Sequence, residues 1–228
     1  MQFSGPLLPA TFLDRPNRFL GIVKIGGANA QCFIPNPGRM KELLHPGAKV
    51  YLLERSSEKR KTRYNMVLVD FGGSLVSIDS MTPNRVVAEA IEAGSIPEFL
   101  DLTVEKREHT YGESRLDFLL RGKKGQLLLE VKSCTLVKDG VGLFPDAPTA
   151  RGSRHLLTLI DGREQGRAAA FFLIQRADAG CLKPNEEADP EFAGNLREAH
   201  RRGVEVYAYT SEVTLEGVSV KEKVPVIL

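Results

Sequence analysis

Short apolar runs separated by turn residues fill the first third of the chain. Runs of this length predict β-strands at 19–25, 30–34, 49–54, 66–70 and 74–78. The breaks between them include Gly26-Gly27, Pro46-Gly47 and Gly72-Gly73, and such residues favour tight turns. One helical turn is expected at 39–44. About five short strands within about 60 residues are typical of a small closed or partly open barrel of the OB type.

The pattern changes near residue 82, where apolar residues begin to recur at helical spacing. The recurring positions are Val86, Val87, Ala90 and Ile91. Thr82 is expected to cap this helix with Pro83 at its first position, although Asn84 can cap as well. We therefore place a domain boundary here, with a barrel domain at 1–83 and a second domain at 84–228.

The second domain mixes strand and helix patterns. Strands are predicted at 103–109, 114–118, 127–132, 168–174 and 204–209, helices from about 149 and at 191–202, and a last hairpin within 212–228. The fully apolar run 168–174 is expected in a sheet covered on both faces. Strand, helix and strand in that order predict a parallel crossover. The fold class is therefore mixed α/β, an OB-like barrel followed by a mixed sheet flanked by helices.

Two carboxylates and one ammonium group meet in the hairpin at 114–132. Side chains alternate along a strand, so Glu130 and Lys132 share a face, and antiparallel pairing puts Asp117 near Glu130. Buried charges need a partner or a metal. One interpretation is a cross-strand ion pair. The other is a divalent-metal site, in which two carboxylates supply the oxygen ligands that Mg²⁺ prefers and the lysine positions water or stabilises phosphoryl charge.

Positive charge gathers in the first part of the chain. Residues 1–83 hold 11 Lys+Arg against 6 Asp+Glu, and the remainder holds 20 against 23. This division fits a domain that holds a polyanion beside one that binds cations, and it also fits ordinary solubility. The turn at 55–63 is a candidate for phosphate contact, and a solvated hairpin tip is the alternative. Its cations are Arg55, Lys59, Arg60, Lys61 and Arg63.

Two further segments carry candidate contacts. The loop 35–40 is expected to be rigid, with Gly38 free to take a positive φ and with Arg39 placed where the loop could aim it at a phosphate; a simple tight turn is the alternative. The helix from about 149 carries Arg151, Arg154 and His155 in its first two turns. Cations there oppose the helix dipole, and an anionic ligand would offset that cost. A lone histidine such as His155 is more often a hydrogen-bonded structural residue.

Cysteine usage and the apolar segments indicate a cytoplasmic, soluble protein without a membrane partner. Cys32, Cys134 and Cys181 form neither a C-x-x-C pair nor a zinc spacing, which is typical of reduced thiols. Residues 1–6 lack the features of a signal peptide. The longest apolar run, 168–174, is too short to span a bilayer.

Islands of sequence along the whole chain carry a family resemblance. They are Phe3-Ser4, Arg15, Arg18-Phe19-Leu20, Pro35-Asn36-Pro37-Gly38-Arg39-Met40, Asn84-Arg85, Tyr111-Gly112-x-Ser114-Arg115-Leu116-Asp117-Phe118, Glu130-Val131-Lys132-Ser133-x-Thr135-Leu136, Phe144-Pro145-Asp146-Ala147-Pro148-Thr149-x-Arg151-Gly152-x-x-His155-Leu156 and Arg202-Gly203-Val204-Glu205-Val206. On these islands the chain resembles the sugar fermentation stimulation protein A family of bacteria and archaea.

The resemblance implies an OB-like domain followed by a PD-(D/E)xK nuclease-type domain, in DNA-binding proteins associated with sugar metabolism. Transferred to this sequence, the resemblance implies that Asp117, Glu130 and Lys132 are the catalytic residues. It also makes Glu89 the carboxylate of the first core helix, and Asp117, Glu130 and Glu89 the ligands of Mg²⁺ or Mn²⁺. From the sequence alone, Glu89 is expected to face water. The commoner motif has a proline where this chain has Leu116.

Three functions compete. The first is a Mg²⁺- or Mn²⁺-dependent nuclease acting on single- or double-stranded DNA, which the retained acidic and lysine residues favour. The second is a non-specific DNA-binding or regulatory protein with an inactive core, and the third, less favoured, is an RNA-processing enzyme. The candidate nucleic-acid contacts are Arg39, Arg55, Lys59, Arg60, Lys61, Arg63, Arg115, Arg151 and His155.

Overall fold

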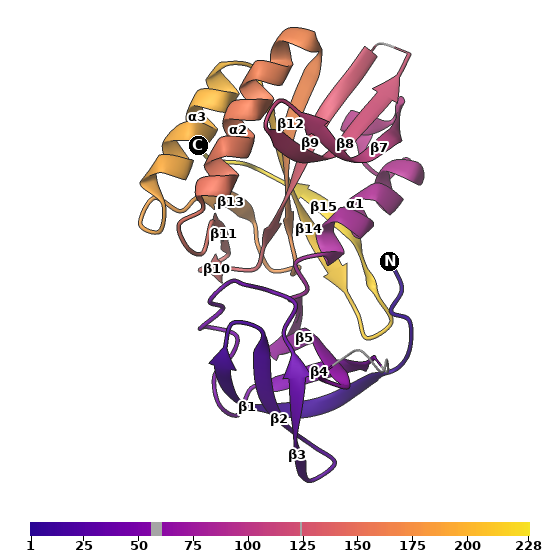
Figure 1. The fold of residues 1–228 in the computed structure, drawn as a ribbon, viewed down its shortest axis with the longest axis vertical. Coiled ribbons are helices and arrows are strands. Elements are labelled where there is room, and N and C mark those ends of the chain that lie inside the picture. The colour runs from indigo at the N-terminus through magenta and orange to yellow at the C-terminus, as the bar shows by residue number, and fades with distance from the viewer. Residues whose placement is uncertain (56–60, 124) are drawn as a thin grey trace.

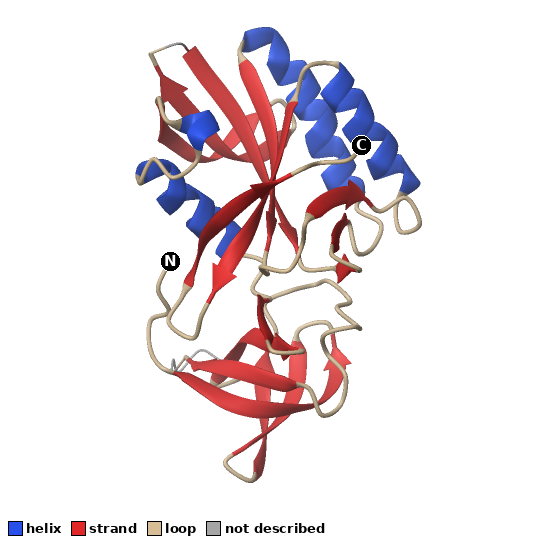
Figure 2. Cartoon of the chain, turned by 180° about the vertical axis from the view of Figure 1, so that it is seen from behind, coloured by secondary structure: helices blue, strands red, loops and turns tan. Residues whose placement is uncertain are grey.

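The fold is known from a computed structural model, which describes residues 1–55, 61–123 and 125–228. A β-barrel built from the first part of the chain lies below a larger unit of sheet and helices in Figure 1. Figure 2 shows the same two units from behind, with loops crossing between them.

Six strands form the barrel sheet. They are β1 (Leu7–Asn17), β2 (Leu20–Ile25), β3 (Ala28–Phe33), β4 (Lys49–Glu54), β5 (Tyr64–Phe71) and β6 (Ser74–Ser77). Their order is β3-β2-β1-β4-β5-β6, and a parallel pairing of β3 with β5 closes the ring. The barrel predicted from the sequence is therefore present, with all five predicted strands and the additional strand β1. The expected helical turn is a single α-turn, in which Leu44 N–H donates to the Met40 carbonyl at 2.9 Å.

The second unit is a mixed sheet with helices on both faces. Its elements are α1 (Thr82–Glu92), η1 (Pro97–Phe99), β7 (Leu102–Tyr111), β8 (Ser114–Gly122), β9 (Gly125–Cys134), β10 (Val137–Lys138), β11 (Val141–Phe144), α2 (Ala150–Gly162), η2 (Arg163–Gln165), β12 (Arg167–Ile174), β13 (Cys181–Pro184), α3 (Pro190–Arg201), β14 (Glu205–Val213) and β15 (Val218–Val224). The large sheet runs β15-β14-β12-β9-β8-β7, and β12 is parallel to both of its neighbours. The strands β10, β11 and β13 form a small second sheet.

The large sheet separates two apolar cores, one under each helical layer. On one face, α2 and α3 pack over residues such as Leu128 and Phe172. On the other face, α1 packs over residues such as Leu129 and Phe171. Figure 1 shows α2 and α3 side by side, with α1 across the sheet from them. Because β12 contributes side chains to both cores, its sequence is apolar at nearly every position.

The helix α1 begins differently from the sequence prediction. Met81 occupies the cap position and makes no side-chain capping bond, while Pro83 lies in the first turn as expected. Thr82 is buried, and the side chain of Asn84 donates to Asp117 instead of capping the helix. The capping prediction is therefore wrong, because Thr82 is itself the first helical residue and the side chain of Asn84 is bonded to Asp117.

The two units are joined at several places along their boundary. Gln2 forms a β-bridge with Gly217, and Phe3 N–H donates to the Glu216 carbonyl at 2.9 Å, so the start of the chain extends the β14–β15 hairpin. From the barrel, Ser77 N–H donates to the Gln175 carbonyl at 2.9 Å. In the described residues, no helix combines the length and the apolar character needed to cross a membrane.

Candidate metal centre and nucleic-acid cleft

The strands β8 and β9 separate at Asp117. Their paired residues run from Gly122–Gly125 to Phe118–Leu129, where the ladder ends. Beyond that point Val131 N–H donates 2.8 Å to Asp117 Oδ2 rather than to a strand carbonyl. The carboxylate is therefore fixed where the two strands diverge. This position follows from the hairpin predicted from the sequence.

The second oxygen of Asp117 is held from α1. Asn84 Nδ2 donates to Asp117 Oδ1 at 2.6 Å. The sequence predicted no role for Asn84 in this site. The one feature that could have indicated a role is that Asn84 belongs to a segment that carries the family resemblance. Asp117 thus receives one backbone and one side-chain donor, which fix its orientation.

Glu130 lies beside Asp117 and is bound from two sides through one oxygen. Its Oε1 accepts from Lys132 Nζ at 2.8 Å and contacts His155 Nδ1 at 2.5 Å. All three side chains are buried. The other oxygen, Oε2, is buried and has no hydrogen-bond partner among the described residues. The pairing of Glu130 with Lys132 on one face confirms the period-two prediction.

His155 reaches this carboxylate from the second turn of α2. Thr149 Oγ1 caps the helix by accepting from Gly152 N–H at 3.0 Å, which confirms the predicted helix start. Arg151 Nε donates to His155 Nε2 at 3.3 Å. A carboxylate accepts and a guanidinium donates, so these two contacts place the His155 proton on Nδ1. The histidine connects exposed Arg151 to buried Glu130.

The two carboxyl groups have opposite pKa shifts. Burial, followed by the negative charge of Glu130, raises the pKa of Asp117 to about 6, against the donors Val131 and Asn84. Burial also acts to raise the pKa of Glu130, but the charge of Lys132 and the bond from His155 outweigh it and lower that pKa. A buried carboxyl whose pKa is raised by an ionised neighbour would be stabilised in its charged form by a bound cation.

The donor set fits a divalent cation that keeps several of its waters. Asp117 and Glu130 Oε2, which has no partner in the described part of the chain, would offer hard oxygen ligands, and Mg²⁺ is commonly held by one or two carboxylates. Within residues 1–55, 61–123 and 125–228, no group of three or more His, Cys, Asp or Glu side chains converges on one point. The remaining ligands of such a cation would therefore be backbone oxygen, water or substrate.

Glu89 does not join this pair, contrary to the ligand set that the resemblance implies. It follows Asn84 by five positions, which turns it about 140° round the helix. Because Asn84 faces Asp117, Glu89 faces away from the site. Its side chain is 53% exposed, and its carboxylate lies 2.6 Å from the amino nitrogen of Met1.

Two adjoining hollows lead from Lys132 along the boundary between the units. The inner one, of about 230 Å³, is lined by Lys132 and Ser133 among others. The outer one, of about 790 Å³, is lined by the cations Arg15, Arg18, Arg39 and Lys41. Both hollows share Gly38 and Asp146. We call this pair of hollows the cleft.

The loop 35–40 forms one wall of the cleft and is held by Arg15. The guanidinium of Arg15 donates to four carbonyls at 2.7 to 2.9 Å, those of Arg18, Asn36, Gly38 and Arg39. Asp146 Oδ2 accepts from Arg39 N–H at 3.0 Å. The expected rigidity is therefore present, and in the described part of the chain Arg18, Arg39 and Lys41 have no ion-pair partner.

Gly38 is required for a reason other than the one predicted. It does not adopt a positive φ. A Cβ atom there would lie 2.6 Å from Asp146 Oδ2 and 2.9 Å from Asn36 Oδ1. The close approach of two side chains, rather than backbone strain, excludes larger residues.

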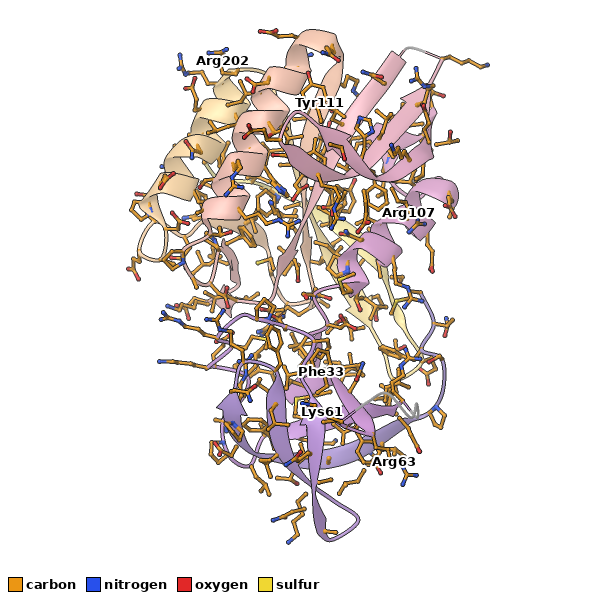
Figure 3. The ribbon with its side chains drawn as sticks, viewed as in Figure 1. Phe33, Lys61, Arg63, Arg107, Tyr111 and Arg202 are labelled. Atoms are coloured by element: carbon orange, nitrogen blue, oxygen red, sulfur yellow. The ribbon has the colours of Figure 1, made fainter. Side chains whose placement is uncertain are left out.

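The other predicted nucleic-acid contacts are dispersed. Arg55 lines a small hollow near Met1, Arg63 pairs with Glu54 at 2.7 Å, and Arg115 lies 3.6 Å from Glu108. Lys61 lies close to Phe33 on the barrel (Figure 3). The remaining two predicted contacts, which lie outside the described residues, are Lys59 and Arg60.

Comparison with known proteins places both units. Residues 13–78 match the family model "SfsA N-terminal OB domain", and residues 81–217 match "Sugar fermentation stimulation protein RE domain". A sugar fermentation stimulation protein homolog of Moorella thermoacetica is 48% identical over 216 residues, 93% of each chain. One from Caldanaerobacter subterraneus is 43% identical over 229 residues, the whole of both chains.

A solved structure extends the likeness to three dimensions. The structure of Pyrococcus furiosus SfsA in complex with Ca²⁺ has 33% sequence identity and a TM-score of 0.93, and the match covers 100% of this chain and 98% of the other. The chain therefore belongs to the sugar fermentation stimulation protein family.

Proposed function

We propose that this protein is a nuclease that uses Mg²⁺ or Mn²⁺ to hydrolyse phosphodiester bonds of DNA held in the cleft. The observation that carries the proposal is the buried, unpartnered Oε2 of Glu130 beside the Asp117 carboxylate and Lys132. A buried carboxylate oxygen without a hydrogen bond lowers the stability of the folded protein unless a ligand binds to it. The Ca²⁺ complex of the Pyrococcus furiosus relative supports a divalent cation.

The bound cation would polarise the phosphate and lower the pKa of a bound water. The protein's own groups would prepare this chemistry. Asn84 and the Val131 amide orient Asp117, while His155 and Lys132 occupy Oε1 of Glu130 and leave Oε2 for the cation. Lys132 would in addition neutralise charge on the phosphate, since it is one of the residues that line the inner hollow.

The cleft supplies the binding surface in this proposal. Arg18, Arg39 and Lys41 line its outer part, and clustered cations are what a phosphate backbone selects. We assign residues 1–83 to holding the nucleic acid and residues 84–228 to its cleavage. The free thiols of all three cysteines support a reducing compartment such as the cytoplasm.

Binding without cleavage is the second candidate. The ion pair between Lys132 and Glu130, at 2.8 Å, favours it, because that contact alone would stabilise the buried charges. A protein of this kind would still bind DNA through the cleft, and RNA is the less favoured ligand.

A cleavage assay separates the two candidates. End-labelled single- and double-stranded DNA is incubated with Mg²⁺, Mn²⁺ or EDTA and with the parent protein, Asp117→Asn or Lys132→Ala. We expect metal-dependent products that both variants reduce by at least about a hundredfold, because each removes a group from the reacting centre. Retained DNA affinity in EDTA shows that the variants are folded. DNA binding with no products from the parent, or equal cutting by the variants, would contradict a nuclease.

A further inference from the structure

An exposed aromatic pair marks a third hollow, on the barrel. The ring of Phe19 is 46% exposed, and it stacks on Phe33 with ring centroids 6.0 Å apart and planes 21° from parallel. The Phe19 carbonyl accepts from Ile34 N–H at 2.9 Å, and Asn17 Oδ1 accepts from Phe19 N–H at 2.9 Å. The backbone of Phe19 is therefore fixed, and its ring packs on Phe33 while the residue stays exposed to solvent.

The chemistry around the pair suits a nucleobase. The hollow, of about 480 Å³, is lined by Phe19 and Phe33 together with Asn17, Gln31 and Lys61. Aromatic rings offer a face for stacking, amides can bond to a base edge, and an ammonium group binds a phosphate. Figure 3 shows Phe33 and Lys61 close together on the barrel.

The hollow adjoins the cleft at Asn17. Asn17 lines both the aromatic hollow and the outer part of the cleft. Arg18, which lies between Asn17 and Phe19 in the sequence, lines the cleft. A phosphate bound at Arg18 would therefore lie one step from a base stacked on Phe19. From there the cleft runs past Gly38 and Asp146 to Lys132.

From this arrangement we propose that Phe19 and Phe33 bind an unpaired base of a DNA strand that passes through the cleft. A duplex keeps its bases stacked on one another, so only a single-stranded segment can present a base face to Phe19. The preferred substrate would then be DNA with a single-stranded segment next to the bond that is cut. That last step rests on the proposed nuclease function, whereas the binding of an unpaired base does not.

The absence of tryptophan from the sequence allows a direct test. Phe19→Trp introduces a single indole at the stacking position, and its fluorescence is followed in EDTA as oligonucleotides are added. We expect quenching by single-stranded oligothymidine, and little quenching by a blunt duplex or by an abasic oligonucleotide of equal length. Phe71→Trp is the matched control, an exposed phenylalanine of the same barrel that Arg176 covers at 4.8 Å.

Affinity measurements complete the test. Phe19→Ala should weaken binding of single-stranded DNA by about tenfold and leave blunt-duplex binding within about twofold, because one stacking contact is lost. Phe71→Ala should change neither. Quenching by the duplex, equal losses for both DNAs, or stronger quenching by RNA of the same sequence would overturn the proposal. Since EDTA prevents metal-dependent cleavage, an inactive but base-stacking protein would overturn only the nuclease function.

Discussion

Two carboxylates in the candidate metal centre, Asp117 and Glu130, are buried in a way that costs the folded protein stability. Asp117 is held by two donors, yet its pKa is raised by burial and by the charge of Glu130. Lys132 and His155 both bind one oxygen of Glu130, so the other is left without a partner in the described structure. The effect of these carboxylates on the free energy of unfolding can be measured.

Replacing Asp117 by Asn should stabilise the protein in a pH-dependent way. The pKa of this carboxyl is about 6 in the folded protein, against 3.8 for an unperturbed aspartic acid, so between about pH 4 and pH 6 the folded state binds more protons. The parent's free energy of unfolding therefore falls as the pH rises, by about 2 to 3 kcal/mol. Urea unfolding in EDTA should show Asp117→Asn more stable by that amount at pH 8 and equal near pH 4.

A difference that stays constant with pH would show that the substitution acts through packing rather than charge. Addition of Mn²⁺ at pH 8 provides a second readout. It should raise the unfolding midpoint of the parent more than that of Asp117→Asn, because a ligand stabilises the state that binds it.

His155 should position Glu130 rather than contact nucleic acid. His155→Asn keeps a donor near the place of Nδ1, whereas His155→Gln moves the donor to the place of Nε2. We expect His155→Gln to lower both Ca²⁺ affinity and the cleavage rate by about tenfold, the value of one charge-assisted hydrogen bond. His155→Asn should stay within a few-fold of the parent. Calorimetry and single-turnover cleavage measure the two effects.

Metal-free DNA affinity is the control for this pair of variants and should be unchanged in both. If both lost DNA affinity in EDTA, the original interpretation of His155 as a nucleic-acid contact would be the better one. Equal losses of Ca²⁺ affinity in His155→Asn and His155→Gln would contradict the prediction that His155 orients Glu130 through a hydrogen bond from Nδ1.

At the scale of elements, the segments whose patterns are local were predictable. The β8–β9 hairpin and β12 follow from their own alternation and apolar character. The strand β1 was missed, since Pro9 and Pro16 interrupt its pattern. Pro9 is tolerated because pairing with β2 begins only at Thr11.

The candidate metal centre was predictable in its hairpin part and not in its helical part. The apolar stripe of the helix correctly predicted that Glu89 faces water, and only the family resemblance implied that it was a ligand, whereas no local pattern indicated that Asn84 contacts Asp117. The clamp of Arg15 on the loop 35–40 spans more than 20 positions and leaves no local pattern. Such contacts form only when strands and loops that are distant in the sequence pack together, so they cannot be predicted from a local sequence pattern.

The loop 35–40 should tolerate no side chain at Gly38. Gly38→Ala would displace two acceptors, Asp146 Oδ2 and Asn36 Oδ1, that hold backbone N–H groups of this loop. We expect a loss of about 1 to 3 kcal/mol in the free energy of unfolding. Gly194→Ala in α3 is the matched control. It meets no atom within 4 Å and should gain up to about 1 kcal/mol from helix propensity. Urea unfolding of both variants measures this, and equal effects would remove the packing argument.

On the scale of the whole molecule, the boundary between the two units is lined by a group of cations, Arg15, Arg18, Arg39 and Lys41. The cations of the cleft lack ion-pair partners in the described residues, whereas distant ones such as Arg107 and Arg202 lie near Glu92 and Glu198. Figure 3 shows Arg107 and Arg202 in the second unit, away from the barrel. Binding of a polyanion should therefore depend on position and not on net charge alone.

A triple substitution tests this distribution. Arg18→Gln, Arg39→Gln and Lys41→Gln together should weaken DNA binding and reduce the slope of log affinity against log salt by about 2 for single-stranded DNA, or about 0.7 for each lost phosphate contact. Arg107→Gln, Arg201→Gln and Arg202→Gln change the net charge equally and should leave the slope unaltered. Fluorescence anisotropy over a salt series gives both slopes, and a common decrease would remove the cleft as the binding surface.

The pairing of residues 2 and 3 with the β14–β15 hairpin limits how the cleft can change its width. The backbone passes between the units before β1 and again between β6 and α1, and Ser77 is hydrogen-bonded to Gln175 beside the second passage. A hinge motion about one linker would break bonds at the other. These contacts at two places resist a change in the size of the opening, so in the proposed function a bound nucleic acid would adapt to it by bending or unpairing. Single-stranded nucleic acids bend more easily than a duplex and would therefore enter such an opening most easily.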